Sequence, residues 1–253
     1  SDEDLTMTLK FWARSVVVAA LFGAAMPVFA AEITSPAKQA HVTDFASGKV
    51  LFSKDADAPM KPASMAKIMT VFVAFQRIAD GQLGMDDKFT ISEKAWKKGG
   101  SRTFLEVGRT VSVRELLYGI IVQSGNDAAI ALAEGISGTE NAFVQEMNFW
   151  AKKIGMKNTN FQNSTGWPDP DLTTTAVDLN IMTAELIRRF PADKYPDLYP
   201  IFAEREYTYN KIRQPNRNPL VYGTVGADGL KTGHTEESGY GLVGSAERDG
   251  QRV

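Results

Sequence analysis

Residues 62–81 read PASMAKIMTVFVAFQRIADG, and the interpretation of the rest of the chain follows from this stretch. Apolar side chains recur every three or four residues from Met65 to Ile78, after a proline and before Asp80-Gly81. This period and these boundaries predict a core-facing helix of about five turns. Ser64 and Lys67 lie three residues apart near its start, so their side chains project from one face and can share a proton.

Short strands are predicted on both sides of a mainly helical middle. Residues 40–45 and 49–53 have β-type composition and are joined by Ala46-Ser47-Gly48, which predicts a hairpin. From residue 85 to 189 the apolar period is mainly helical, and the proline-containing loop Gly166–Leu172 interrupts it. The helices expected here are 113–121, 127–134 (closed by Gly135), 140–154 (closed by Gly155) and 176–190, and the later strands expected are 207–209, 220–222, 229–232 and 240–246.

This order of elements predicts an α/β fold of the α+β type. The N-terminal and C-terminal strands are expected to pair in one mixed sheet, flanked by the mainly helical region. A chain of 253 residues is long enough to bury a core of this kind. It stops at Val253, shortly after the turn signal Asp249-Gly250, which predicts an open sheet edge and a natural protein that continues.

The composition excludes several kinds of chemistry. Lys plus Arg number 28 against 30 for Asp plus Glu, a net charge of −2, which leaves no basic surface for nucleic acid. Cysteine is absent and only two histidines occur, which excludes disulfides, thiol nucleophiles and Cys-based zinc sites. A hydrolytic site must therefore use serine, lysine, asparagine and carboxylates, and no cofactor is expected.

The first thirty residues have the pattern of a targeting segment. Residues 7–14 carry two positive charges, an apolar run follows, and small residues come after Pro27. This is the layout of a secretory signal peptide with cleavage after Ala30, and the apolar run is shorter than the ~20 residues of a membrane-spanning helix. We expect residues 1–30 to be an N-terminal extension plus signal peptide, residues 31–253 to be the catalytic domain, and the mature protein to be periplasmic.

Two further short motifs follow the Ser64-Lys67 pair in the chain. Ser124-Gly125-Asn126 lies between two expected helices, where it would present a hydroxyl and an amide. Lys231-Thr232-Gly233 lies on an expected strand, so Lys231 and Gly233 point one way and Thr232 the other. Each motif alone also fits an ordinary cap, loop or exposed lysine, whereas the ordered set SxxK, SxN and KTG indicates a serine acyl-transfer enzyme.

With these motifs, the sequence resembles the serine D-alanyl-D-alanine carboxypeptidases, the low-molecular-mass penicillin-binding proteins of a peptidase S11-like family. The resemblance covers residues 35–253 and implies a β-lactamase/transpeptidase-like fold. It is carried by segments 63–70, 123–129, 161–166, 216–218 and 228–235.

The resemblance also implies a catalytic set. Ser64 would attack the carbonyl of the penultimate D-alanine of a peptidoglycan stem peptide, and Lys67 would be its general base. Ser124 and Lys231 would form the proton path to the leaving amine. Asn126 would hold the substrate amide. β-Lactam antibiotics would acylate the same serine.

A second set of residues is implied for binding. Thr232 and Arg217 would bind the terminal carboxylate of the substrate, since a guanidinium is well shaped for that group. The backbone N–H groups of Ser64 and His234 would form the oxyanion hole, with His234 otherwise a wall residue. Gly233, lacking a side chain, would let the substrate backbone lie against its strand.

Two alternatives stay open at this point. A serine β-lactamase would use the same scaffold, although SGN replaces its usual SDN and loop 169–173 lacks the glutamate and asparagine that direct water in class A enzymes. A catalytically silent peptidoglycan-binding protein is the other. In the family, a closing strand and helix, a small β-rich domain and a membrane-seating amphipathic helix follow, and the sequence contains no counterpart of them up to Val253.

Overall fold

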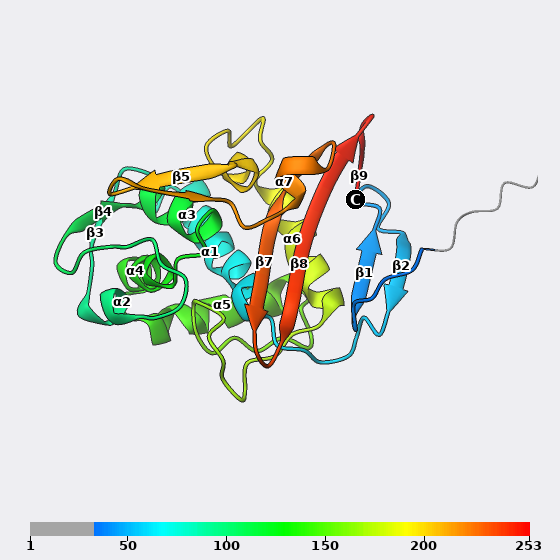
Figure 1. The fold of residues 1–253 in the computed structure, drawn as a ribbon, viewed down its shortest axis with the longest axis horizontal. Coiled ribbons are helices and arrows are strands. Elements are labelled where there is room, and N and C mark those ends of the chain that lie inside the picture. The colour runs from blue at the N-terminus through cyan, green and yellow to red at the C-terminus, as the bar shows by residue number, and fades with distance from the viewer. Residues whose placement is uncertain (1–32) are drawn as a thin grey trace, which may run out of the picture. The chain divides into compact units, whose positions relative to one another are not determined.

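Helix α1 (Lys67–Ala79) runs through the core, as Figure 1 shows in cyan. The structure is a computed structural model that describes residues 33–253, with Ser35–Val253 as one compact unit. The expected extension and signal peptide at residues 1–30 lie outside the described residues. A 3₁₀ turn, Ala63–Ala66, precedes α1, and residues 67–75 are buried without a break. The predicted core helix is confirmed, with a 3₁₀ first turn and a shorter α-helical part than the five turns expected, and it is covered on every side rather than on one face.

Helices from the middle of the chain surround α1. Phe190, at the end of α6, packs edge-on against Phe72 and Phe75 of α1, with ring centroids 5.7 and 5.5 Å apart. The surrounding helices are α3 (Val113–Ile121), α4 (Asn126–Ser137), α5 (Glu140–Ile154) and α6 (Ala176–Arg189), with the short α2 (Glu93–Lys97) against α4 and a 3₁₀ turn at Tyr199–Ala203.

Within the described residues the strands form four separate antiparallel sheets. Three are two-stranded: β1 (Ala40–Thr43) with β2 (Val50–Lys54), β3 (Lys88–Thr90) with β4 (Thr110–Ser112), and β5 (Glu206–Tyr209) with β6 (Ile212–Pro215). The fourth contains β7 (Ala227–Thr235), β8 (Gly239–Arg248) and β9 (Gln251–Arg252), and its two long strands lie side by side in Figure 1. Within residues 33–253 no helix combines the length and apolar character needed to cross a membrane.

The structure confirms the α+β class and differs from the expected sheet in its pairing. The hairpin at 40–54 is confirmed, but it forms no common ladder with the C-terminal strands. The two ends of the unit meet through the Phe45 N–H, which donates to the Arg252 carbonyl at 2.9 Å. Strand β9 pairs with β8, and the hydrogen bond from Phe45 stands where the sequence predicted a ladder.

Two local predictions are wrong, each for a reason visible in the packing. Residues 220–222 form a helical turn, α7 (Leu220–Gly223), because Pro219 has φ −67° and the Asn218 side chain accepts the Leu220 N–H. Gly135 does not close α4, which continues to Ser137 and ends at Gly138 with φ 79°. A Cβ on Gly135 would lie 2.1 Å from the Phe89 ring, so this glycine serves packing.

Candidate active site

The hydroxyl of Ser64 and the amine of Lys67 meet at the start of α1. Lys67 has no exposed surface, and its Nζ lies 2.9 Å from Ser64 Oγ. The same Nζ lies 2.7 Å from Asn126 Oδ1 and 2.7 Å from the Thr165 carbonyl oxygen. Ser64 is partly exposed, in the 3₁₀ turn, so it can meet a substrate while its neighbouring amine is shielded from water.

The three partners of Lys67 Nζ differ in what they can do. The carbonyl oxygens of Asn126 and Thr165 only accept hydrogen bonds, whereas the Ser64 hydroxyl can also donate. A neutral amine has two N–H groups and one lone pair. The two carbonyls occupy the N–H groups, so the lone pair faces the Ser64 proton. Asn126 is fixed in this orientation because its Nδ2 donates to the Gly99 carbonyl at 2.8 Å.

Two buried lysines of the site have pKa values below the ordinary range. Burial holds the pKa of Lys67 well below its usual value, and the positive charges of Lys231 and Arg217 act in the same direction. Burial and the charge of Arg217 lower the pKa of Lys231 to about 7. Lys231 can therefore exchange its proton near neutral pH, and Lys67 gives up its proton more readily than an exposed lysine, as a proton relay and a general base require.

Ser124 and Lys231 form the second hydroxyl–amine pair. Lys231 comes from β7, is 3% exposed, and donates from Nζ to Ser124 Oγ at 2.9 Å. Ser124 has φ +58°, an uncommon conformation for a residue with a side chain, at the connection between α3 and α4. The next residue, Gly125, has no room for a side chain, because a Cβ would lie 2.1 Å from Thr103 Oγ1.

Gly233 brings β7 against the 3₁₀ turn that carries Ser64. A Cβ on Gly233 would lie 2.9 Å from the Pro62 carbonyl oxygen and 3.2 Å from Ala63 Cβ. The space freed by this glycine is therefore taken by the protein's own backbone. The role expected from the sequence, in which a substrate backbone lies against the strand at Gly233, stays a prediction.

The remaining predicted binding residues lie around these pairs. Arg217 donates from Nη1 to Ser101 Oγ at 2.5 Å and is close enough for its charge to act on both buried lysines. Thr232 is partly exposed, and the exposed His234 stacks on Tyr240 with ring centroids 4.1 Å apart. Their contacts with a substrate carboxylate or oxyanion stay predictions.

The loop of residues 163–167 holds the Thr165 carbonyl in place, and no role was predicted for it. Asn163 Oδ1 accepts the N–H groups of Gly166 and Trp167 at 2.8 and 2.9 Å, and the N–H and hydroxyl of Thr165 at 3.2 and 2.9 Å. Gly166, with φ +78°, passes so close to Ala63 that a Cβ would lie 1.7 Å from the Ala63 carbonyl oxygen. The Asn-x-x-Gly spacing is a turn signal, but it does not identify the catalytic partner.

A buried carboxylate, also without a predicted role, holds the other side of the site. Asp127 accepts the backbone N–H groups of Thr103 and Leu105 at 2.8 and 3.1 Å. These bonds fix residues 101–105, and the Ser101 carbonyl in turn accepts the Asn126 N–H at 2.8 Å. Asp127 thus keeps Asn126 in place from the first turn of α4.

Comparisons with known proteins agree with this geometry. A family model described as D-alanyl-D-alanine carboxypeptidase, peptidase S11, matches residues 26–253. The D-alanyl-D-alanine carboxypeptidase DacC of Escherichia coli is 41% identical over 245 residues, which cover 92% of this chain and 60% of DacC. The chain spans between about half and three fifths of the length of the curated relatives it matches.

Solved structures share the fold. Penicillin-binding protein 5 of Haemophilus influenzae is similar with a TM-score of 0.81 and 40% identity, over 87% of this chain and 65% of that one. Penicillin-binding protein D2 of Listeria monocytogenes, in an ampicillin-bound form, is similar with a TM-score of 0.76 and 30% identity, over 87% of this chain and 88% of that one. The fold is therefore that of the transpeptidase-like penicillin-binding proteins.

Proposed function

The chain belongs to the D-alanyl-D-alanine carboxypeptidase family of S11 peptidases, and we propose that it removes the terminal D-alanine from peptidoglycan stem pentapeptides. One observation carries the proposal most of the way: Lys67 Nζ lies 2.9 Å from Ser64 Oγ and 2.7 Å from each of two carbonyl oxygens, so the neutral amine would turn its lone pair toward the Ser64 hydroxyl. That arrangement suits a serine nucleophile with a lysine general base. The names of the relatives supply the substrate class.

The acylation step follows from the two hydroxyl–amine pairs. Ser64 Oγ forms a bond to the carbonyl carbon of the penultimate D-alanine while Lys67 takes its proton. The C–N bond to the terminal D-alanine then breaks, and Ser124, paired with Lys231, delivers a proton to the leaving nitrogen. The proton that Lys67 took from Ser64 then replaces the one that this pair has lost, so Lys67 is again neutral. Water attacks the ester in the second step, so the acid is released and Ser64 recovers its proton.

The substrate would be oriented by one cationic group and several neutral ones. Arg217 and Thr232 would bind the terminal carboxylate. The positive charge of Arg217 already acts on the site, since it lowers the pKa of Lys231. Asn126 would hold the substrate amide, although its own amide is engaged by Gly99 and Lys67. The backbone N–H groups of Ser64 and His234 would stabilise the oxyanion.

Penicillins are proposed to acylate Ser64, since a related penicillin-binding protein has been crystallised in an ampicillin-bound form. We also propose that the protein acts in the periplasm, outside the cytoplasm. The pattern of positive, apolar and small residues in 7–31 supports this location. So does the proposed substrate, which belongs to the cell wall.

The chain offers its own matched control for the test of the nucleophile. Ser35-Pro36-Ala37-Lys38 is a second SxxK segment, and the hydrogen bonds from Lys54 to it reach only the backbone carbonyls of Ser35 and Ala37. We expect Ser35→Ala to release D-alanine from diacyl-Lys-D-Ala-D-Ala like the unchanged protein, and Ser64→Ala to release none. Equal release by Ser64→Ala and the unchanged protein would overturn the proposal.

Intact-mass analysis after exposure to a penicillin separates the proposed activity from the β-lactamase alternative. We expect one adduct per chain, absent in Ser64→Ala, that persists for many times the acylation time. A transient adduct with rapid turnover of the penicillin would instead assign the lactamase reaction. Absence of both the adduct and D-alanine release would favour a silent peptidoglycan-binding protein.

A further inference from the structure

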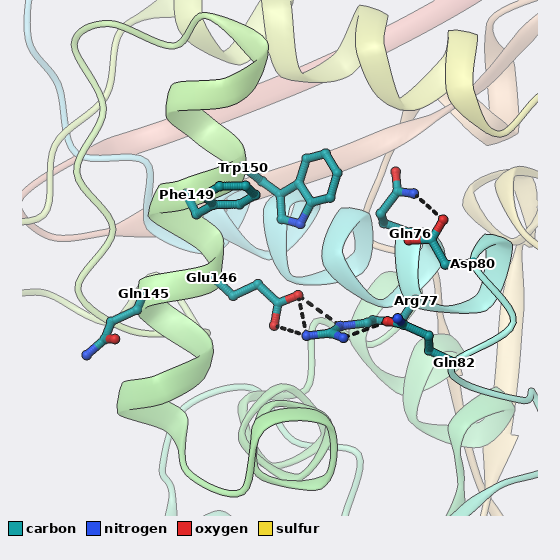
Figure 2. A pocket seen from close by; sticks show the side chains of 8 residues that line it. All are labelled: Gln76, Arg77, Asp80, Gln82, Gln145, Glu146, Phe149 and Trp150. Atoms are coloured by element: carbon teal, nitrogen blue, oxygen red, sulfur yellow. Dashed lines mark hydrogen bonds and ion pairs between the residues drawn. The ribbon is translucent and has the colours of Figure 1, made fainter.

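A cavity of about 470 Å³ lies between the end of α1 and the middle of α5, away from the candidate active site. Figure 2 shows its lining, with Gln76, Arg77 and Asp80 on α1 and Glu146, Phe149 and Trp150 on α5. Its volume is within the range of small-ligand sites. The lining residues of α1 follow Lys67 by nine to thirteen positions, which is about 14–20 Å along the helix axis. Since residues 67–75 are buried, α1 crosses the core between the candidate active site and this cavity.

One wall of the cavity is aromatic. Phe149 is 58% exposed, whereas its neighbour Trp150 is 8% exposed, and their rings meet edge to face with centroids 5.7 Å apart. Lys153 Nζ lies over the Trp150 ring, 4.3 Å from its centroid. In Figure 2 the indole nitrogen faces Glu146 and Arg77, and no hydrogen bond joins it to the residues that line the cavity. Phe149 thus offers exposed apolar surface, with Lys153 Nζ 5.5 Å from its ring centroid, and Trp150 offers an N–H donor.

The opposite wall is polar, and the Arg77 guanidinium in it is already paired with Glu146. Arg77 donates to both oxygens of Glu146, at 2.9 and 3.0 Å, and to Gln82 Oε1 at 2.6 Å. Gln76 Nε2 donates to Asp80 Oδ1 at 3.0 Å. The guanidinium is neutralised and the lining carries two carboxylates, so an anionic ligand is disfavoured. Carboxylate and amide groups of this kind suit a neutral ligand with many hydroxyls.

We propose that this cavity binds a neutral N-acetylated amino sugar of a glycan strand. A pyranose ring has a C–H face that can lie on Phe149 and hydroxyls that donate to carboxylates and accept from amides. The acetamido carbonyl can accept the Trp150 N–H. The inference rests on the proposed function in one respect, because peptidoglycan stem peptides are attached to strands of such sugars. The cavity would anchor the protein on glycan while Ser64 acts on a stem peptide across the core.

A peptide-free glycan isolates this site from the catalytic one. Calorimetric titration of the full chain with the tetrasaccharide of N-acetylglucosamine should give saturable binding. Phe149→Ala removes the apolar face, and Trp150→Phe removes the N–H while keeping an aromatic ring, so each should weaken binding at least five-fold. Trp96→Phe makes the same chemical change on α2, where Trp96 is 39% exposed, and should leave binding unchanged.

D-Alanine release from a soluble diacyl tripeptide separates the two proposals. Phe149→Ala should release D-alanine at the unchanged rate, since Phe149 is exposed on α5, outside the catalytic groups. No saturable binding of the tetrasaccharide, or equal binding by Phe149→Ala, Trp150→Phe and the unchanged protein, overturns the sugar site. Binding that depends on Phe149 and Trp150 in a protein that releases no D-alanine supports the sugar site and refutes the proposed activity.

Discussion

Replacing Lys231 by methionine should stabilise the folded protein while it abolishes activity. Lys231 is buried, and its pKa of about 7 is far below the ordinary value of 10.5. At any pH below about 7 the amine is protonated in both the folded and the unfolded chain, and the folded chain must then keep a charge in a buried place. Methionine has a similar length, no charge and no need for a hydrogen-bond partner.

The magnitude follows from the pKa difference. A shift from 10.5 to about 7 corresponds to roughly 5 kcal/mol of unfavourable free energy in the folded state. The substitution also removes the hydrogen bonds to Ser124 and to the Thr232 carbonyl, which together offset about 2–3 kcal/mol of that amount. The net expectation is a gain of about 2–3 kcal/mol at pH 6.

The sign of the pH dependence follows from the same shift. A lysine with a lowered folded-state pKa destabilises the fold fully below that pKa, and the effect fades as pH rises toward the unfolded value. The advantage of Lys231→Met over the unchanged protein should therefore be largest at pH 6 and disappear, or reverse, by pH 10.

Urea unfolding of both proteins at several pH values measures this difference directly. Lys88→Met, at an exposed position on β3, is the matched control and should show a small difference that does not vary with pH. A Lys231→Met protein that is less stable at pH 6, or whose difference from the unchanged protein is constant between pH 6 and pH 10, would refute the reasoning.

Three further outcomes are expected. Penicillin acylation of Ser64 should slow as pH falls, because protonation of Lys67 removes the lone pair that accepts the Ser64 proton; a flat rate between pH 5 and pH 9 would contradict this. Asn163→Ala should slow acylation about 10- to 100-fold and move its pH profile, because the Thr165 carbonyl that holds Lys67 would lose its own hydrogen bonds. A change in melting temperature with unchanged acylation would leave Asn163 a structural residue. Gly166→Ala should destabilise the protein by about 2–4 kcal/mol in thermal or urea unfolding, because the added methyl group would meet the Ala63 carbonyl and φ is +78°. A loss of stability below about 1 kcal/mol would show that the loop can move away.

Helices with a strong period of apolar residues were predictable from the sequence. Elements whose structure depends on adjacent turn residues or on contacts with distant side chains were not. The helices at 113–121 and 140–154 have the predicted bounds, because each begins at a capping side chain: Ser112 accepts the Glu115 N–H, and Thr139 accepts the Ala142 N–H. Residues 220–222 have β-type composition, but the turn chemistry of Asn218 and Pro219 decided their structure. The position of Gly135 inside α4 depends on Phe89, which no local pattern reveals.

The candidate site divides in the same way. Ser64, Lys67, Ser124, Asn126 and Lys231 could be proposed from their side chains, because hydroxyl and amine groups in ordered motifs carry a chemical signal. One partner that orients Lys67 is the backbone carbonyl of Thr165. Every residue has a backbone carbonyl, so this partner carries no signal in the sequence. Its position depends on Asn163 and on contact between segments about 100 residues apart, which a single sequence does not display.

The glycines on either side of Ala63 have a consequence for how the protein matures. Gly166 and Gly233 both press on the backbone of the turn that holds Ser64, and they come from late parts of the chain. The nucleophile is therefore assembled only when β7 and the 163–167 loop have both docked. A nascent or partly refolded chain that already contains Ser64 and Lys67 would be chemically silent. A fluorescent penicillin added during refolding would then count finished molecules, and its time course would report the last docking event rather than the first collapse.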